Sequence, residues 1–148
     1  MDFTAPIAAF VAGFPFFLIH LGVALALFVG SLIIYVLMTH HKELAVIRAG
    51  NPSAALAFGG VVVGLAIPLG SCLEHSIGLF DLLIWGVVTL LIQLLAFRFA
   101  DIFLRGLPRR IAEGDVAAAV FLMSVKIGLA IILSGAVADP NVDMMRGG

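Results

Sequence analysis

Long apolar runs separated by short polar clusters dominate the chain, and they predict helices that cross a membrane. The first run covers residues 6–39. As one helix it would measure about 51 Å, well beyond a hydrocarbon core of about 30 Å. Because Gly13-Phe14-Pro15 offers a break, residues 16–38 are predicted as the first span and residues 3–13 as a separate interfacial segment. The other predicted spans are residues 53–73, 77–100 and 116–137.

Composition supports this interpretation, because 63% of the residues are hydrophobic and only 11% are charged. Soluble domains carry about 25% charged residues. The net charge of −1 gives no support for nucleic-acid binding, and the single cysteine, Cys72, excludes an internal disulfide. Since the linkers are short, residues 1–148 are expected to form one all-α membrane domain with four spans, in contact with the lipid bilayer.

The distribution of positive charge predicts how the chain crosses the membrane. Two loops hold six of the eight Lys and Arg residues: Lys42, Arg48, Arg98, Arg105, Arg109 and Arg110. The opposite side is mostly acidic: Asp2, Glu74, Asp81, Asp139 and Asp143, with Arg146. Because positively charged loops stay in the cytoplasm, both termini are expected outside it.

An internal repeat underlies the four spans. Residues 47–71 align without a gap with residues 111–135, and ten of the 25 positions are identical. In each copy a glycine is followed by a residue suited to cap a helix, Asn51 in the first and Asp115 in the second. The sequence therefore predicts two parallel two-helix repeats, residues 16–73 and 80–137, related by an axis along the membrane normal.

The residues at these junctions resemble a known family. Residues 43–55 read ELAVIRAGNPSAA, and residues 111–119 read IAEGDVAAA after Asp101. This pattern is similar to that of the domain of unknown function 350 family, small bacterial inner-membrane proteins built from two such repeats. Asp115 departs from the asparagine expected in that family. The resemblance implies a topology and a bacterial inner membrane, but it implies no activity.

One charged residue, Lys126, lies inside the fourth predicted span. It is eleven residues from Asp115, or about 16 Å deep, where a charge costs at least about 2.5 kcal/mol. Thr89 and Gln93 of the third span lie at similar depth, while Asp101 and Asp115 are expected to be too far away to pair with it. Lys126 could be a neutral, structural residue bonded to Gln93, it could line a pathway for an anion or proton, or it could bind a partner chain or lipid headgroup.

Other polar and small residues suggest packing roles. Gly60 and Gly64 match Ser124 and Gly128 in the repeat, and small residues four apart let membrane helices approach closely. The two pairs predict a tight seam between the second and fourth spans, so leucine at Gly64 or Gly128 should destabilise the fold. The lone intramembrane histidine, His20, is typical of a hydrogen bond between helices. Tyr35 and Trp85 fit the aromatic belts at the two membrane interfaces.

These features favour two kinds of function. No catalytic constellation, metal site or cofactor motif is predicted, so the protein is not expected to be an enzyme. The first possibility is a homo-oligomeric channel or small-solute permease, with Lys126, Gln93 and Thr89 lining a pathway between protomers. The second is an accessory subunit that packs against a larger membrane complex and transports nothing.

Overall fold

The computed structural model describes residues 4–39 and 42–137, and within these ranges the regular structure is entirely α-helical. The helices are α1 (Thr4–Met38), α2 (Lys42–Arg48), α3 (Pro52–His75), α4 (Leu79–Phe103), α5 (Leu107–Ala112) and α6 (Val116–Val137). Four of these, α1, α3, α4 and α6, are long and apolar enough to cross a membrane. Of the charges used for orientation, those of Asp2, Asp139, Asp143 and Arg146 lie outside the described residues.

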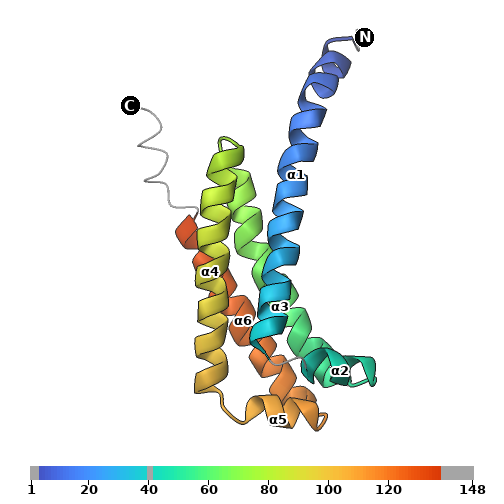
Figure 1. Ribbon diagram of the computed structural model, residues 1–148, viewed down its shortest axis with the longest axis vertical. Helices are drawn as coiled ribbons and strands as arrows, with labels where there is room; N and C mark the ends of the chain where they lie inside the picture. Colours follow the sequence, from blue (N-terminus) through green and yellow to red (C-terminus); the bar gives the residue numbers. More distant parts are fainter. Residues whose placement is uncertain (1–3, 40–41, 138–148) are drawn as a thin grey trace.

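Helix α1 is continuous, so the prediction of a break near Pro15 and of a separate segment at residues 3–13 is wrong for the part described, Thr4 onward. Proline removes one backbone hydrogen bond, but an apolar environment offers no alternative partner for the other backbone groups, and the helix satisfies them internally. Figure 1 shows the N-terminal end of α1 rising past the ends of the other helices. Every side chain from Thr4 to Ile19 is exposed in this protomer.

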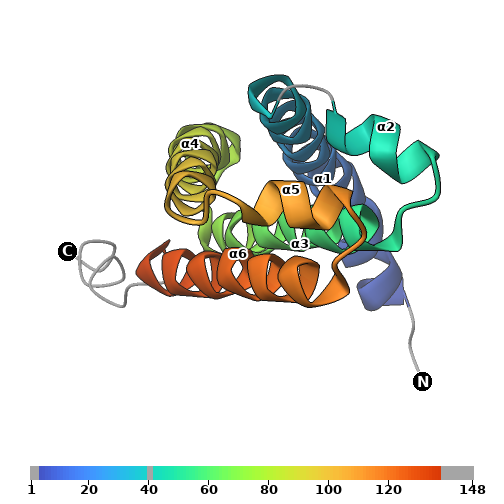
Figure 2. The same ribbon diagram turned by 90° about the horizontal axis from the view of Figure 1, so that it is seen from below.

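Helix α3 occupies the centre of the bundle, with α1 and α4 on one side and α6 on the other. Figure 2 shows α3 and α6 side by side along their lengths. They run in the same direction, because Asn51 before α3 bonds to Ala112 just before α6, and Ser71 donates to the Ser134 carbonyl near the far end. A cluster of aliphatic and aromatic side chains fills the space between α1, α3 and α4: Tyr35, Val61, Leu65, Leu69, Leu90, Leu94 and Phe97.

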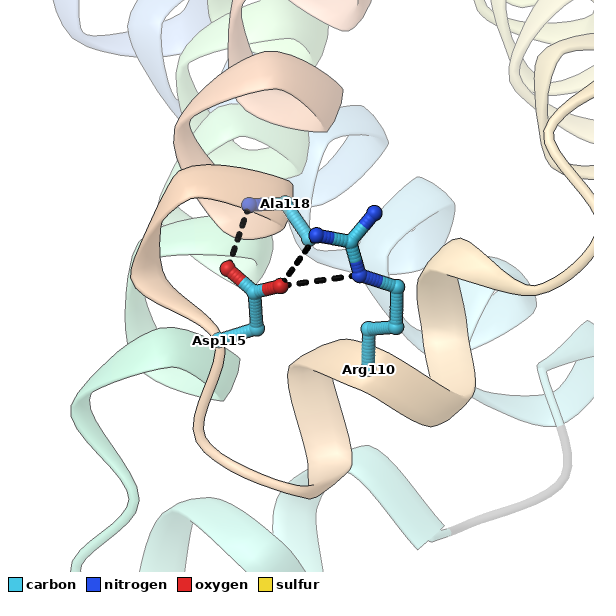
Figure 3. A network of polar contacts seen from close by, with 3 residues as sticks. All are labelled: Arg110, Asp115 and Ala118. Carbon is cyan, nitrogen blue, oxygen red and sulfur yellow. Dashed lines mark hydrogen bonds and ion pairs between the residues drawn. The ribbon is translucent and has the colours of Figure 1, made fainter.

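The two junctions that lead into α3 and α6 share the same backbone hydrogen bonds at an offset of 64 residues. Gly50 and Gly114 adopt φ values of 87° and 97°, which end the preceding short helices α2 and α5. The cap prediction is confirmed: Asn51 Oδ1 and Asp115 Oδ1 each accept from the amide three residues later, both at 3.1 Å. Figure 3 shows the second cap, where Asp115 also pairs with Arg110.

The short helices α2 and α5 lie across one end of the bundle (Figure 1). The sequence did not predict either helix, because each is too short to show an apolar period. Their apolar side chains pack on the first turns of α3 and α6, forming a second core of Ala54, Ala57, Ile111, Ala118, Ala119 and Leu122. Two packed helices, rather than extended loops, therefore cover this end of the bundle.

Candidate functional site

Lys126 is fully buried inside the protomer and has two polar partners. Its Nζ donates a hydrogen bond to the Tyr35 hydroxyl at 2.8 Å and lies 3.1 Å from Asp101 Oδ1, with 1% of the side chain exposed. The prediction that Asp101 is too far away to pair is wrong. That prediction compared only the depths of Asp101 and Lys126 along their helix axes. A helical side chain, however, points toward the N-terminus of its helix. The long Lys126 side chain thus extends toward the end of the bundle where Asp101 lies.

Aromatic rings complete the surroundings of the ammonium group. Nζ lies 4.9 Å from the centroid of the Tyr35 ring and 5.4 Å from that of Phe97, distances at which a ring face attracts a cation. Tyr35 is 3% exposed and meets the Phe97 ring edge to face. The assignment of Tyr35 to an interfacial belt is therefore wrong, although Trp85 is half exposed as that role requires. Tyr35, the one tyrosine of the sequence, lies inside an apolar span, and that was the sequence signal for this site.

A second carboxylate approaches the cluster from helix α2. Glu43 is half-buried and hydrogen-bonds through its side chain to Tyr35. Burial raises the pKa of Glu43 above its ordinary value, the positive charge of Lys126 opposes that rise, and the negative charge of Asp101 adds to it. Sequence reasoning missed Glu43, because it lies outside the predicted spans. Four helices thus bring together Tyr35, Glu43, Asp101 and Lys126, which we term the buried charge cluster.

The buried charge cluster lies beside a cavity of about 380 Å³ at the end of the bundle covered by α2 and α5. Glu43 and Asp101 line this cavity directly, and its other polar lining residues are Thr39, Arg98 and Arg109. The Asp101 side chain is 14% exposed, against 1% for Lys126. The carboxylate therefore faces the cavity, while the ammonium group is on the dry side of the ion pair.

Gln93 and Thr89 are buried deeper in the bundle, at 0% and 2% exposure, on the same face of α4 as Asp101. Neither the oxygen nor the nitrogen of the Gln93 amide has a hydrogen-bond partner among the described residues. The Gln93 side chain therefore does not hold Lys126, as the structural interpretation required. Thr89 instead lies 3.4 Å from the Cys72 thiol, measured from Oγ1 to Sγ.

His20 does not join the buried charge cluster. Its Nδ1 lies 2.9 Å from the Phe16 carbonyl of its own helix, and its ring lies tilted against that of Phe16, with 4.0 Å between the ring centroids. Its Nε2 has no hydrogen-bond partner in the described part of the chain. The prediction of a hydrogen bond between helices is therefore wrong for this histidine.

Gly60 and Gly64 of α3 lie at close helix contacts as predicted, whereas the prediction is wrong for Ser124 and Gly128 of α6. A methyl group at Gly60 would come within 2.8 Å of the Met123 backbone, and one at Gly64 within 2.6 Å of the Phe97 ring and 3.3 Å of the Lys126 carbonyl. The matched residues of α6 face away. Ser124 is exposed and bonds within its helix, and nothing lies within 4 Å of a methyl group placed at Gly128. Small residues would permit close helix packing at these positions of both helices, but only those of α3 lie against a neighbouring helix.

Comparison with known proteins identifies the family. Residues 9–137 match the Domain of Unknown Function (DUF350) family. The UPF0719 inner membrane protein YjfL of Escherichia coli, from strains K12 and O157:H7, is 33% identical over 100 residues, which cover 68% of this chain and 76% of that protein. No solved structure matches the chain. The chain therefore belongs to the DUF350 family and is an integral inner-membrane protein with four candidate spans.

Proposed function

We propose that this member of the DUF350 family is a small permease or channel of the inner membrane, whose pathway starts at the cavity beneath α2 and α5. The observation that carries the proposal is the ion pair between Lys126 and Asp101, buried at the inner side of that cavity. Ionisable groups inside membrane segments are costly, and they mark ion pathways, proton relays or ligand sites. A purely structural role could be filled more cheaply by apolar packing.

Burial supports a pathway within the protomer rather than between protomers. Lys126, Gln93 and Thr89 are all at most 2% exposed within a single chain, so they are not available to line an interface. A homo-oligomer remains part of the proposal, but the pathway itself does not require one. Each protomer would then act as an independent unit.

A non-enzymatic role is also proposed. The polar groups around the cavity are two carboxylates, two guanidinium groups and a threonine hydroxyl. Asp101 is engaged by Lys126, and Arg109 pairs with Glu113 at 2.9 Å. Among the residues lining the cavity there is no serine, cysteine or histidine to act as a nucleophile or general base.

Flux measurements on reconstituted protein test the permease proposal. Wild type, Lys126→Met and Arg105→Gln would be compared in proteoliposomes for passage of protons, chloride, phosphate and small carboxylates. Lys126→Met should change the flux or its selectivity. Arg105→Gln removes a positive charge at an exposed position outside the cavity, so it should behave like wild type. Absence of flux in wild type for every one of these species would contradict the proposal.

The orientation is proposed to place α2 and α5 in the cytoplasm and both termini outside. Support comes from Arg48, Arg98, Arg105, Arg109 and Arg110, which all lie at the α2/α5 end of the bundle. The cavity would then open toward the cytoplasm. Cysteines placed at Ala45 and Leu107 in a Cys72→Ser background should resist an impermeant thiol reagent in intact cells. Labelling of either from outside would reverse the orientation.

The accessory-subunit function is the second candidate, and one observation favours it. The side chains of α1 from Thr4 to Ile19 are all exposed in the protomer, and they include Phe10, Phe14, Phe16 and Phe17. A larger membrane complex could cover this surface. Native mass measurement in mild detergent tests this: co-purifying foreign subunits support it, whereas a single species or a defined homo-oligomer supports the permease.

We also propose that the two halves of the chain derive from one two-helix unit. The matched hydrogen bonds at the junctions support this, since Asn51 N bonds to the Val46 carbonyl and Asp115 N to the Arg110 carbonyl, 64 positions later. The two halves would have diverged mainly in their packing faces. A chain made of two copies of residues 16–73 should not fold stably if those faces differ as the structure indicates.

A further inference from the structure

The buried charge cluster forms the cavity end of a longer row of mostly polar side chains. Along one face of α4, Asp101, Phe97, Gln93 and Thr89 follow each other at intervals of four residues. This spacing places them one above the other, about 6 Å apart along the helix. All four are buried or nearly so. The row therefore leads from the cavity near α2 and α5 toward the other end of the bundle, and Phe97 is its single apolar member.

The far end of this row meets a second cavity. Thr89 contacts Cys72, and Cys72 lines a cavity of about 140 Å³ together with His75, Ser76, Asp81 and Trp85. This cavity lies at the end of α3 and the beginning of α4, opposite to α2 and α5. Polar groups thus lie at intervals between the two cavities in the interior of a single protomer, interrupted on α4 by Phe97.

The middle of the row is too tightly packed for a hydrated ion or an organic solute. Phe97 and Gln93 are both 0% exposed, and a methyl group at Gly64 would already come within 2.6 Å of the Phe97 ring. An ion could pass only if Phe97 and its neighbours moved apart. A proton needs no such space, because it moves along hydrogen bonds between side chains and single water molecules.

Gln93 is the residue best suited to hold such water. Both polar atoms of its amide are buried without a protein partner, and an unsatisfied buried group costs about 1–3 kcal/mol. Native proteins usually satisfy such groups with internal water, which needs two to four polar neighbours. On α4 the Gln93 amide, with a donor and an acceptor, lies between Thr89 and Asp101, the residue that pairs with Lys126.

We infer that the species passed by this protein is the proton, carried from the α2/α5 cavity through Asp101 and Lys126, along water held by Gln93, to Thr89 and the second cavity. This inference rests on the proposed permease function and names its substrate. It distinguishes the protein from a channel for chloride or small carboxylates, which would need an open passage past Phe97.

Each step moves one proton and leaves the covalent structure unchanged. A proton from cavity water neutralises the Asp101 carboxylate. The Lys126 ammonium then gives a proton to a water molecule bonded to Gln93 and becomes neutral. Lys126 regains a proton from Asp101, which restores the ion pair, while the proton on the water continues toward Thr89. The direction of net flow follows the proton gradient and the membrane potential.

Several charged groups face this route and will affect its pH dependence. Glu43 and Tyr35 contact each other beside Lys126, Arg98 and Arg109 line the first cavity, and His75 and Asp81 line the second. Because burial raises the pKa of Glu43, this carboxyl keeps its proton to a higher pH than an exposed carboxyl does. It is therefore placed to supply protons to the cavity side of the route.

The experiment measures proton entry into liposomes that contain a pH-sensitive dye, after a potassium gradient with valinomycin imposes a membrane potential. Wild type should change the internal pH. Gln93→Leu, which keeps the side chain's bulk but cannot hold water, should lose most of this flux, and Thr89→Val should reduce it. The matched control is Leu91→Ala, a half-exposed position on the same helix, which should behave like wild type. Thermal unfolding should show Gln93→Leu at least as stable as wild type, so that loss of flux is not loss of fold.

The possible outcomes separate this inference from the proposed function. Passage of chloride or small carboxylates without protons would overturn the inference and leave the permease in place. Proton flux that is unchanged in both Gln93→Leu and Thr89→Val would overturn the route, because the protons would then follow another path. Absence of every flux in wild type would contradict both the permease and its proposed substrate.

Discussion

Helices α3 and α6 carry the same sequence pattern at an offset of 64 residues, yet they occupy different environments. α3 packs against α1, α4 and α6, whereas α6 packs mainly against α3. Gly64 of α3 lies under the Phe97 ring, while the matched Gly128 of α6 has open space around it. The comparison shows that a shared local sequence produces the same turn and helix cap, but the surrounding helices decide which face is buried.

The clearest difference lies two residues before these glycines. Val62 of α3 is half-buried, and its counterpart in α6 is Lys126, the most buried charge in the described part of the chain. The interior polar site therefore depends on a residue that only the second half possesses. Substitutions at matched positions of the two halves test how far the two helices have diverged.

The largest effect is expected when Lys126 loses its partner. Asp101→Asn leaves the ammonium group buried beside a neutral side chain, and breaking a buried ion pair in this way costs about 3–5 kcal/mol. Lys126→Val, which gives α6 the residue found in α3, should cost less, because Asp101 is next to the cavity and can be hydrated. Unfolding in detergent by heat or denaturant provides the measurement.

The double variant Asp101→Asn/Lys126→Val is the matched control for that prediction. Removing both charges should recover most of the stability lost in Asp101→Asn, since no unpaired charge remains in the interior. If Asp101→Asn alone is as stable as wild type, the ion pair is not formed in the membrane protein. If the double variant is no better than the single one, the loss has a cause other than the buried charge.

A smaller effect is expected at the glycines, and it should be strongly asymmetric. Gly64→Leu places a large side chain against Phe97 and the Lys126 carbonyl, and overpacking of this kind costs about 1–3 kcal/mol. A Cβ placed at Gly128 meets no atom within 4 Å, so we expect Gly128→Leu to change stability by no more than about 0.5 kcal/mol. This revises the expectation from sequence, in which both variants were destabilising. Equal losses of thermal stability in the two variants would show that Gly128 is covered, for example by another protomer.

Much of the fold could be predicted from the sequence. The expected spans at residues 53–73, 77–100 and 116–137 agree with α3, α4 and α6 to within a few residues, because a membrane helix needs a long apolar run. The caps at Asn51 and Asp115 were also correct, since capping depends on neighbours in the chain. The continuity of α1 was not predicted, because the sequence cannot show that a proline is tolerated in an apolar environment.

The candidate site could be predicted only in part. Lys126 stood out because a charge in an apolar run needs an explanation, and its burial within the protein was one of the interpretations weighed. Its partners did not follow, because Tyr35, Glu43 and Asp101 belong to three other helices and come together only through tertiary packing. The comparison of depths along the helix axes gave the wrong prediction for Asp101, because it ignored the direction in which the long Lys126 side chain extends.

A smaller loss than at Gly64 is expected at the two caps, where the halves are most alike. Asn51→Ala removes the bond to the Ala54 amide, and loss of an N-cap costs about 1 kcal/mol. It also removes the bonds from Asn51 Nδ2 to the Ile111 and Ala112 carbonyls, at 3.3 Å and 3.0 Å, which tie the first junction to the second. Asp115→Ala removes the matching cap and an exposed ion pair with Arg110, so we expect it to be the milder of the two changes.

The pH dependence of stability distinguishes the two caps. The hydrogen bond from the Ala118 amide and the contact with Arg110 hold the pKa of Asp115 below its usual range. The contribution of Asp115 is therefore present above the ordinary pKa of a carboxyl group and is lost as the pH falls through its lowered value. Acidification should destabilise wild type relative to Asp115→Asn, whereas the difference between wild type and Asn51→Ala should stay constant, because Asn51 does not titrate. Thermal unfolding of these two variants and wild type at neutral and acidic pH measures both differences. A difference for Asp115→Asn that does not change with pH would show that the Asp115 carboxylate makes no ionic contact at the cap.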